Sequence, residues 1–101
     1  MKFSIDPRAR REMIEAVTYY AGRGGPNLGE ALLRAFEKTC EIARLNPEIG
    51  VVWRSKTRML SLDRFPYNLI YVFQQGNLRV IALAHQRRRP GYWRGRTPEP
   101  R

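Results

Sequence analysis

The segment Leu78–Arg96, with the sequence LRVIALAHQRRRPGYWRGR, changes character at His85. Residues 78–84 are apolar at almost every position, and a run that is apolar on both alternating faces is typical of a strand in the interior of a sheet. Residues 85–96 then hold five arginines, two aromatic residues and the only histidine of the chain. A rigid strand that ends in concentrated charge is well suited to placing a functional surface. We therefore expect the rest of the chain to be the scaffold for this surface.

Strand-like stretches are expected upstream of this segment. Composition and alternation predict them at residues 51–53, 59–62 and 68–73. Residues 75–77, Gln-Gly-Asn, predict a tight turn in which Gly-Asn is the two-residue loop of a hairpin. The second half of the chain is therefore expected to form an antiparallel sheet.

The first half begins with a short strand and a helix. Residues 2–5 alternate between polar and apolar, which predicts the strand. Asp6 is a suitable N-cap for the helix, and Pro7 suits its first position. Glycines and a proline at residues 22–26 predict the end of this helix and a five-residue joint.

A second helix is expected from Asn27, which together with Glu30 resembles a capping box, to Asn46, which precedes a proline. The order β-α-α-β-β-β predicts an α+β fold in which a helical hairpin packs on the antiparallel sheet. Residues 1–96 are expected to form this single domain. Residues 97–101 carry no core residues and are expected to be a disordered tail.

Composition excludes several classes of protein. No apolar stretch approaches the ~20 residues of a membrane span, and the N-terminus has no apolar signal region. Cys40 is the only cysteine, so it forms no internal disulfide, and we interpret it as a small core residue. One cysteine and one histidine do not make a usual zinc site, and no metal or cofactor is expected. A reducing cytoplasm is the expected location.

The positive charge is concentrated in the second half of the chain. The net charge is +10 in total. Residues 1–50 hold eight Lys/Arg and seven Asp/Glu, a net of +1, whereas residues 51–101 hold eleven and two, a net of +9. This asymmetry indicates a basic face that meets an anionic partner, either nucleic acid or an acidic protein. The alternative is a surface whose charge serves only solubility.

Two motifs resemble a known superfamily. They are FPYNLIY at residues 65–71 and HQRRRPGYW at residues 85–93, and an Asn-Pro-x-x-Gly junction at residues 46–50 accompanies them. With the order of elements, they resemble the RelE/ParE toxins of type II toxin–antitoxin systems, over residues 5–94. The resemblance is greatest to the ParE-like branch, also called plasmid stabilisation proteins. It implies a small basic toxin that a cognate acidic antitoxin holds inactive in a hetero-oligomer.

The two branches of this superfamily imply different activities. ParE toxins of this kind inhibit DNA gyrase by binding, without catalysis, whereas RelE toxins of the same fold cut messenger RNA on the ribosome. Inhibition of gyrase is our interpretation of this chain. Its expected target-binding residues are His85, Arg87, Arg88, Arg89, Tyr92, Trp93 and Arg94.

The alternative is a metal-independent endoribonuclease, which needs a base, a proton donor and cations for the phosphate. Its candidates are His85 as base or acid, Tyr92 as acid or stacking platform, and five cations as phosphate clamps: Lys56, Arg58, Arg87, Arg88 and Arg89. Ribosome-cutting relatives typically carry arginine directly after the aromatic residue at position 67. This chain has Asn68 there, which counts against nuclease activity.

Purely structural interpretations stay open for the same residues. His85 at a strand end is also typical of a hydrogen-bonded structural histidine. Tyr92 and Trp93 are also suited to fold back and cover the open sheet. Lys56 and Arg58 are also typical of solvated loop charges. A third function class is a nucleic-acid-binding module that shares the fold without being a toxin.

Overall fold

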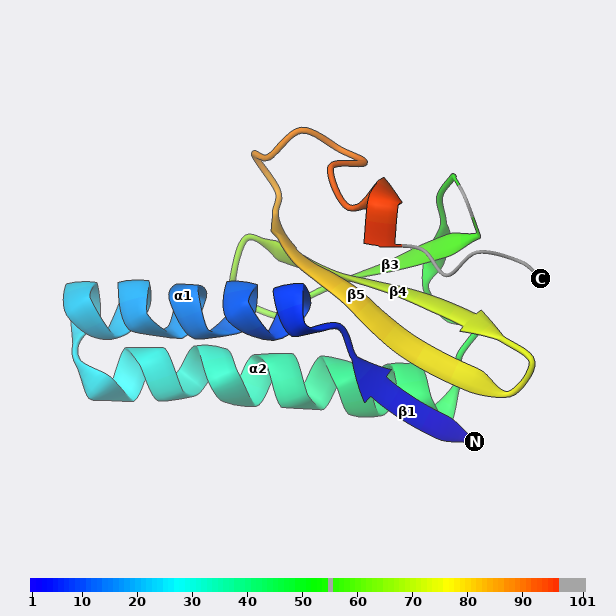
Figure 1. The fold of residues 1–101 in the computed structure, drawn as a ribbon. Helices are drawn as coiled ribbons and strands as arrows, with labels where there is room; N and C mark the ends of the chain where they lie inside the picture. The colour runs from blue at the N-terminus through cyan, green and yellow to red at the C-terminus, as the bar shows by residue number, and fades with distance from the viewer. Residues whose placement is uncertain (55, 97–101) are drawn as a thin grey trace.

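The computed structural model describes residues 1–54 and 56–96, and it forms an α+β fold (Figure 1). A helical hairpin covers one face of a five-stranded sheet, and the chain after the last strand crosses the other face. No helix in these ranges is long and apolar enough to cross a bilayer. The elements are β1 (Lys2–Ile5), α1 (Pro7–Gly24), α2 (Pro26–Leu45), β2 (Val51–Val52), β3 (Thr57–Ser61), β4 (Tyr67–Gln74), β5 (Asn77–His85) and the 3-10 turn η1 (Arg94–Arg96).

The strand order is β1-β5-β4-β3-β2, so β5 lies inside the sheet, as its apolar sequence predicts. The prediction of an antiparallel sheet is confirmed for β2 to β5. β1 differs because it runs parallel to β5, with Lys2 opposite Asn77 and Ile5 opposite Val80. A parallel pair needs a long connection, and here both helices and three strands separate the two partners.

An irregularity in β5 explains why its apolar residues do not simply alternate between the faces. Tyr71 pairs with Val80 and Ile70 pairs with Ala82, so Ile81 is an extra residue in the ladder. Both faces of β5 are nevertheless buried. The core cluster between the helices and the sheet includes Leu32, Phe36, Tyr71, Leu78, Val80 and Leu83, and the cluster on the opposite side of the sheet includes Ile70, Val72, Ile81, Ala82, Ala84 and Trp93.

The start of α1 forms as predicted. Asp6 is the N-cap, and its carboxylate accepts a hydrogen bond from the backbone N–H of Arg8 at 2.8 Å. The guanidinium of Arg8 donates two more, each at 3.0 Å, and that of Arg79 approaches to 3.4 Å. The hydrogen bonds from Arg8 lower the pKa of the buried Asp6 carboxyl to about 2, against the effect of burial.

The predicted five-residue joint between the helices is wrong. α1 continues to Gly24, only Gly25 separates the helices, and Pro26 begins α2. One residue with a φ of 91° is enough for the reversal, and glycine adopts it without strain. The predicted capping box is also wrong, because α2 has no side-chain cap and Glu30 instead forms an ion pair with Arg34.

The hairpin between β4 and β5 differs from its prediction by one residue. Gln74 pairs with Asn77, so the loop is Gln75-Gly76 rather than Gly76-Asn77. Both loop residues have positive φ, 53° and 75°, as a type I′ turn requires. Cys40 is buried as predicted, and burial raises the pKa of its thiol to about 12.

Candidate functional site

The chain after β5 folds back over the face of the sheet that the helices leave open. We call residues 86–96 the C-terminal segment. Trp93 anchors its middle, because its side chain is only 3% exposed and its ring lies 5.3 Å from the ring of Trp53. Gly91 allows this approach, since a Cβ there would lie 2.7 Å from the Trp53 ring. Trp93 is therefore part of the core on the face of the sheet opposite the helices, where a target cannot reach it without displacing the segment.

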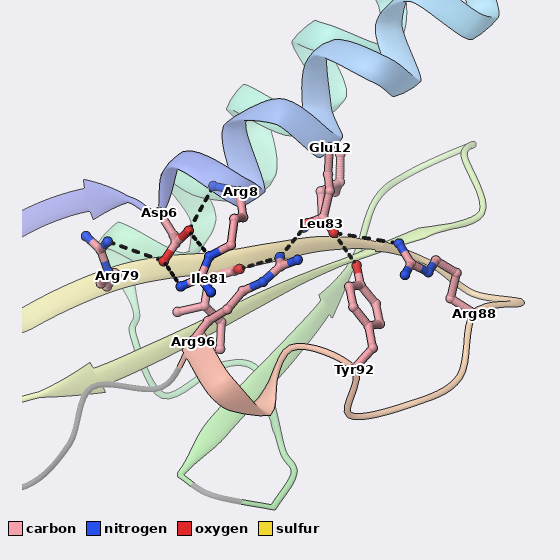
Figure 2. A network of polar contacts seen from close by, with 9 residues as sticks. All are labelled: Asp6, Arg8, Glu12, Arg79, Ile81, Leu83, Arg88, Tyr92 and Arg96. Carbon is pink, nitrogen blue, oxygen red and sulfur yellow. Dashed lines mark hydrogen bonds and ion pairs between the residues drawn. The ribbon is translucent and has the colours of Figure 1, made fainter.

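One carboxylate on α1 receives most of the polar contacts that side chains of the C-terminal segment make with the rest of the described domain (Figure 2). The Glu12 carboxylate accepts hydrogen bonds from the Tyr92 hydroxyl at 2.8 Å and from Arg96 Nη1 at 2.9 Å. The guanidinium of Arg88 lies 3.8 Å away. The backbone N–H of Leu83 also donates to Glu12, at 3.1 Å. Residues far apart in the sequence therefore converge on a single side chain.

The local cause of this arrangement is the early end of β1. The last pair of the parallel ladder is Ile5 with Val80, so residues 81–83 of β5 have no strand on that edge. Glu12 accepts from the free N–H of Leu83, and Arg96 Nη1 donates to the carbonyl of Ile81 at 3.0 Å. The two side chains satisfy backbone groups that a longer β1 would have paired.

The sequence analysis did not single out Glu12. A signal was present in its spacing, because Glu12 lies three residues after Ala9 and four residues before Ala16. Both alanines are buried, so Glu12 belongs to the inner face of the helix. A carboxylate on that face requires partners, and its partners lie in the last strand and beyond it.

The arginines of the C-terminal segment fall into two groups. Arg88 lies over the ring of Tyr92, 3.8 Å from its centroid, and faces Glu12. Arg96 forms the closer ion pair with the same carboxylate. The other three are exposed and form no ion pair with a carboxylate of residues 1–54 or 56–96: Arg87, Arg89 and Arg94.

Tyr92 is held by the interactions that bury it. Burial and the hydrogen bond to Glu12 raise the pKa of its hydroxyl above the usual range for tyrosine. Its edge also contacts Trp93, with ring centroids 5.2 Å apart. Tyr92 therefore keeps its proton and uses it to bind Glu12.

His85 occupies a structural position at the end of β5. Its Nδ1 accepts a hydrogen bond from the backbone N–H of Arg87 at 3.0 Å, which fixes the turn after the strand. Its ring meets that of Tyr67 edge to face, with centroids 5.1 Å apart. With Nδ1 occupied as an acceptor, the neutral imidazole carries its proton on Nε2.

Arg58 also has a structural role. Its Nη1 donates to the carbonyls of Glu48 and Gly50, at 2.9 and 3.0 Å. The Tyr71 hydroxyl fixes the same junction, because it donates to the Pro47 carbonyl at 2.8 Å and accepts from Gly50 N–H at 3.0 Å. The Asn-Pro-x-x-Gly motif is thus a turn that two side chains of the sheet hold in place.

Two of the residues expected for a ribonuclease, Arg58 and His85, are not brought together. Arg58 pairs with Tyr71 and His85 pairs with Tyr67, so they lie two strands apart and four residues apart along β4. Four residues of a strand correspond to about 13 Å. Lys56 is exposed in the β2–β3 loop. Among the described residues no three His, Cys, Asp or Glu side chains form a group that could hold a metal ion.

The fold is that of the RelE/ParE-like toxins, in which a helical hairpin packs on an antiparallel-dominant sheet. A solved structure of the chromosomal ParDE toxin–antitoxin system from P. aeruginosa is similar, with a TM-score of 0.64 over 84% of this chain and 95% of that chain. The identity of 15% makes this a likeness of fold. The family model of the ParE toxin of the type II toxin–antitoxin system parDE matches residues 3–90, so the chain belongs to the ParE toxin family. A comparison with curated protein sequences found no significant match.

Proposed function

We propose that this ParE-family toxin inhibits DNA gyrase by binding to it through the C-terminal segment. The observation that carries the proposal is the exposure of Arg87, Arg89 and Arg94, three arginines without a carboxylate partner among the described residues. They project from a segment that Trp93 and Glu12 fix to the sheet. Arginine is enriched at binding hot spots, and a contact that is ordered beforehand loses less entropy on binding.

Binding fits these side chains better than catalysis does. A ribonuclease would need Tyr92 or His85 to exchange a proton with the RNA. The Tyr92 proton is bound to Glu12, and a phenolate beside that carboxylate would be strongly disfavoured. His85 presents only Nε2, since its Nδ1 holds the turn at Arg87. These contacts support a protein-binding surface.

The position that carries arginine in ribosome-cutting relatives is engaged in a neutral network. Asn68 accepts hydrogen bonds from Ser61 Oγ at 3.0 Å and from Gln86 Nε2 at 3.3 Å. It therefore ties the C-terminal segment to the sheet and supplies no charge for a phosphate. This arrangement supports gyrase rather than ribosome-bound RNA as the target.

The proposal is tested by exchanging the three exposed arginines together. The variant Arg87→Ala/Arg89→Ala/Arg94→Ala should lose inhibition of supercoiling by purified gyrase while it keeps its melting temperature, because exposed substitutions usually change stability by within ~0.5 kcal/mol each. The matched control replaces three exposed arginines of α1 and changes the net charge equally: Arg10, Arg11 and Arg23. The control should inhibit like the wild type.

Two results would overturn the proposal. One is a triple variant that inhibits gyrase as well as the control does. The other is a wild-type toxin that leaves supercoiling intact but causes cleavage of messenger RNA at ribosome-bound codons. The second result would establish the ribonuclease alternative. In cells, the proposal requires that replication stops and the DNA-damage response begins before translation falls.

We further propose that the cognate antitoxin is an acidic chain that binds beside β2, and that both act in the cytoplasm. β2 ends the sheet, and the outer edge of such a strand is a template for pairing with another chain. Its valines, Val51 and Val52, are 70% and 64% exposed, and Leu45 before it is 79% exposed. The net charge of +9 in residues 51–101 favours an acidic partner over a second copy of this chain.

A thermal shift with the product of the neighbouring gene tests this second proposal. A ligand at ~1,000 times its Kd stabilises the fold by about 4 kcal/mol. The variant Val51→Lys/Val52→Lys should abolish the shift, whereas Ile14→Lys, at an aliphatic residue of α1 that is 53% exposed, should retain it. If the wild type shows no shift, or the β2 variant shifts fully, this placement of the antitoxin is wrong.

A further inference from the structure

We infer that Glu12 is the positioning residue of the target-binding surface, although it lies on α1, 80 residues before Tyr92. The inference rests on the proposed function, in which exposed arginines of the C-terminal segment bind the target. Glu12 does not itself need to touch the target. It fixes the segment that carries the arginines.

The pattern of polar contacts carries the inference. Gln86 begins the segment and is tied to the sheet through Pro66 and Asn68. In the described part of the chain, the polar contacts from side chains of residues 87–96 to the body of the domain end on Glu12, with one exception. The exception is the hydrogen bond from Arg96 to the Ile81 carbonyl, and Arg96 is itself paired with Glu12.

Charge makes Glu12 more than one hydrogen-bond acceptor among several. Residues 87–96 contain five arginines and no acidic residue. Glu12 faces two of them. Its pair with Arg96 is weakly screened by solvent because the two side chains are only 12% and 14% exposed, whereas Arg88 is 55% exposed. Without this carboxylate, Arg96 would be a largely buried cation, and it would repel the arginines near it.

The apolar contacts of the segment act at a different place. Trp93 is buried in the core on the face of the sheet opposite the helices, with Arg87, Arg88 and Arg89 before it in the chain and Arg94 and Arg96 after it, and its contact with Trp53 does not involve Glu12. Loss of the Glu12 charge should therefore leave the middle of the segment in place and loosen the parts on either side. Those parts carry Arg87, Arg89 and Arg94.

The test uses the isosteric variant Glu12→Gln. A glutamine still accepts hydrogen bonds through Oε1, but it no longer neutralises Arg88 and Arg96. If the binding arrangement falls to about one-tenth of the population, the apparent Kd for purified gyrase rises about tenfold. The control is Glu15→Gln, the same substitution at an exposed glutamate on the same helix, and it should bind like the wild type.

A second variant separates positioning from any direct contact with the target. In Glu12→Gln/Arg96→Gln the charge that Glu12 neutralised at close range is removed together with Glu12, and two amides can hydrogen-bond in its place. Because Arg96 faces inward, this double variant should recover most of the affinity that Glu12→Gln loses. A strongly non-additive pair of this kind is expected for directly interacting residues.

Amide hydrogen exchange keeps the inference testable if gyrase is not the target. Glu12→Gln should accelerate exchange in residues 87–96 and leave β3 and β4 protected. A wild type that does not bind gyrase, combined with this local acceleration, would refute the proposed function while it supports the role of Glu12. The inference would be overturned if Glu12→Gln left exchange in residues 87–96 unchanged. It would also be overturned if the wild type bound gyrase and Glu12→Gln bound it with the same affinity.

Discussion

Replacing Asp6 with asparagine should make the toxin less stable at neutral pH and equally stable near pH 2. The Asp6 carboxylate accepts three hydrogen bonds from Arg8 and faces Arg79, and these contacts lower its pKa from the ordinary 3.8 to about 2. One pKa unit corresponds to about 1.4 kcal/mol. The charged form therefore contributes about 2 kcal/mol to the free energy of unfolding. Asparagine keeps the ability to cap α1 but lacks this charge.

The direction of the pH dependence follows from the lowered pKa. A carboxyl that is more acidic in the folded state stabilises the fold above its unfolded pKa, near 4, and this stability is lost as the pH falls towards 2. The difference between wild type and Asp6→Asn should accordingly be about 2 kcal/mol at pH 7 and shrink steadily below pH 4. Comparing the two proteins cancels the titration of the other acidic groups.

Urea unfolding at a series of pH values measures this difference. Both proteins should unfold in one transition with the same dependence on urea, since the exchange leaves the buried surface unchanged. A difference that stays constant from pH 7 to pH 2.5 would refute the reasoning, because it would mean that the charge of Asp6 contributes nothing. Asp6→Ala is the companion variant. Its free energy of unfolding should be lower than that of Asp6→Asn by a further ~1 kcal/mol at every pH, because alanine cannot cap the helix.

Three other outcomes are expected from the same geometry. His85→Ala should reduce inhibition of gyrase only a few fold, because His85 holds a turn, and a loss of 10²-fold or more with an intact fold would indicate catalysis instead. Tyr71→Phe should lower the free energy of unfolding by about 1–3 kcal/mol, since it leaves Gly50 N–H without its partner; a change below 0.5 kcal/mol in urea would contradict this. Cys40 should resist alkylation at pH 8 until the protein unfolds, because burial raises the pKa of its thiol to about 12, and rapid modification of the native toxin would show that the thiol is accessible.

Elements whose signals are local could be predicted from the sequence. The N-cap at Asp6 depends on two adjacent residues, and the interior position of β5 follows from a run that is apolar on both faces. The predictions were wrong where the same residues are compatible with two different turn positions. A Gln-Gly-Asn stretch can turn at either pair of residues, and the pairing of Gln74 with Asn77 decides which pair is used. When several glycines stand at a helix end, the sequence likewise does not determine which of them adopts the positive φ that ends the helix.

The site was harder to predict because its contacts are long-range. The exposed positions of Arg87 and Arg89 follow from their place after a core strand. The burial of Trp93 depends on the β2–β3 loop, which brings Trp53 to the same face of the sheet. The role of Glu12 depends on where β1 ends, because the Leu83 N–H is free to donate to a side chain only where β1 no longer pairs with β5. No spacing within residues 85–96 contains that information.

The consequence is that the basic cluster is not one functional unit, although it is continuous in the sequence. The sequence prediction assigns four of the five arginines of residues 85–96 to a binding surface, all except Arg96. In the structure, Arg88 instead shares one carboxylate with Arg96, and this pair of arginines holds the segment in place. The remaining three can act on a target without first breaking an ion pair inside the described part of the toxin, so they retain their full charge for binding. The ion pairs of Arg88 and Arg96 with Glu12 thus keep the three exposed arginines at a fixed position, and the binding surface depends on both groups of arginines.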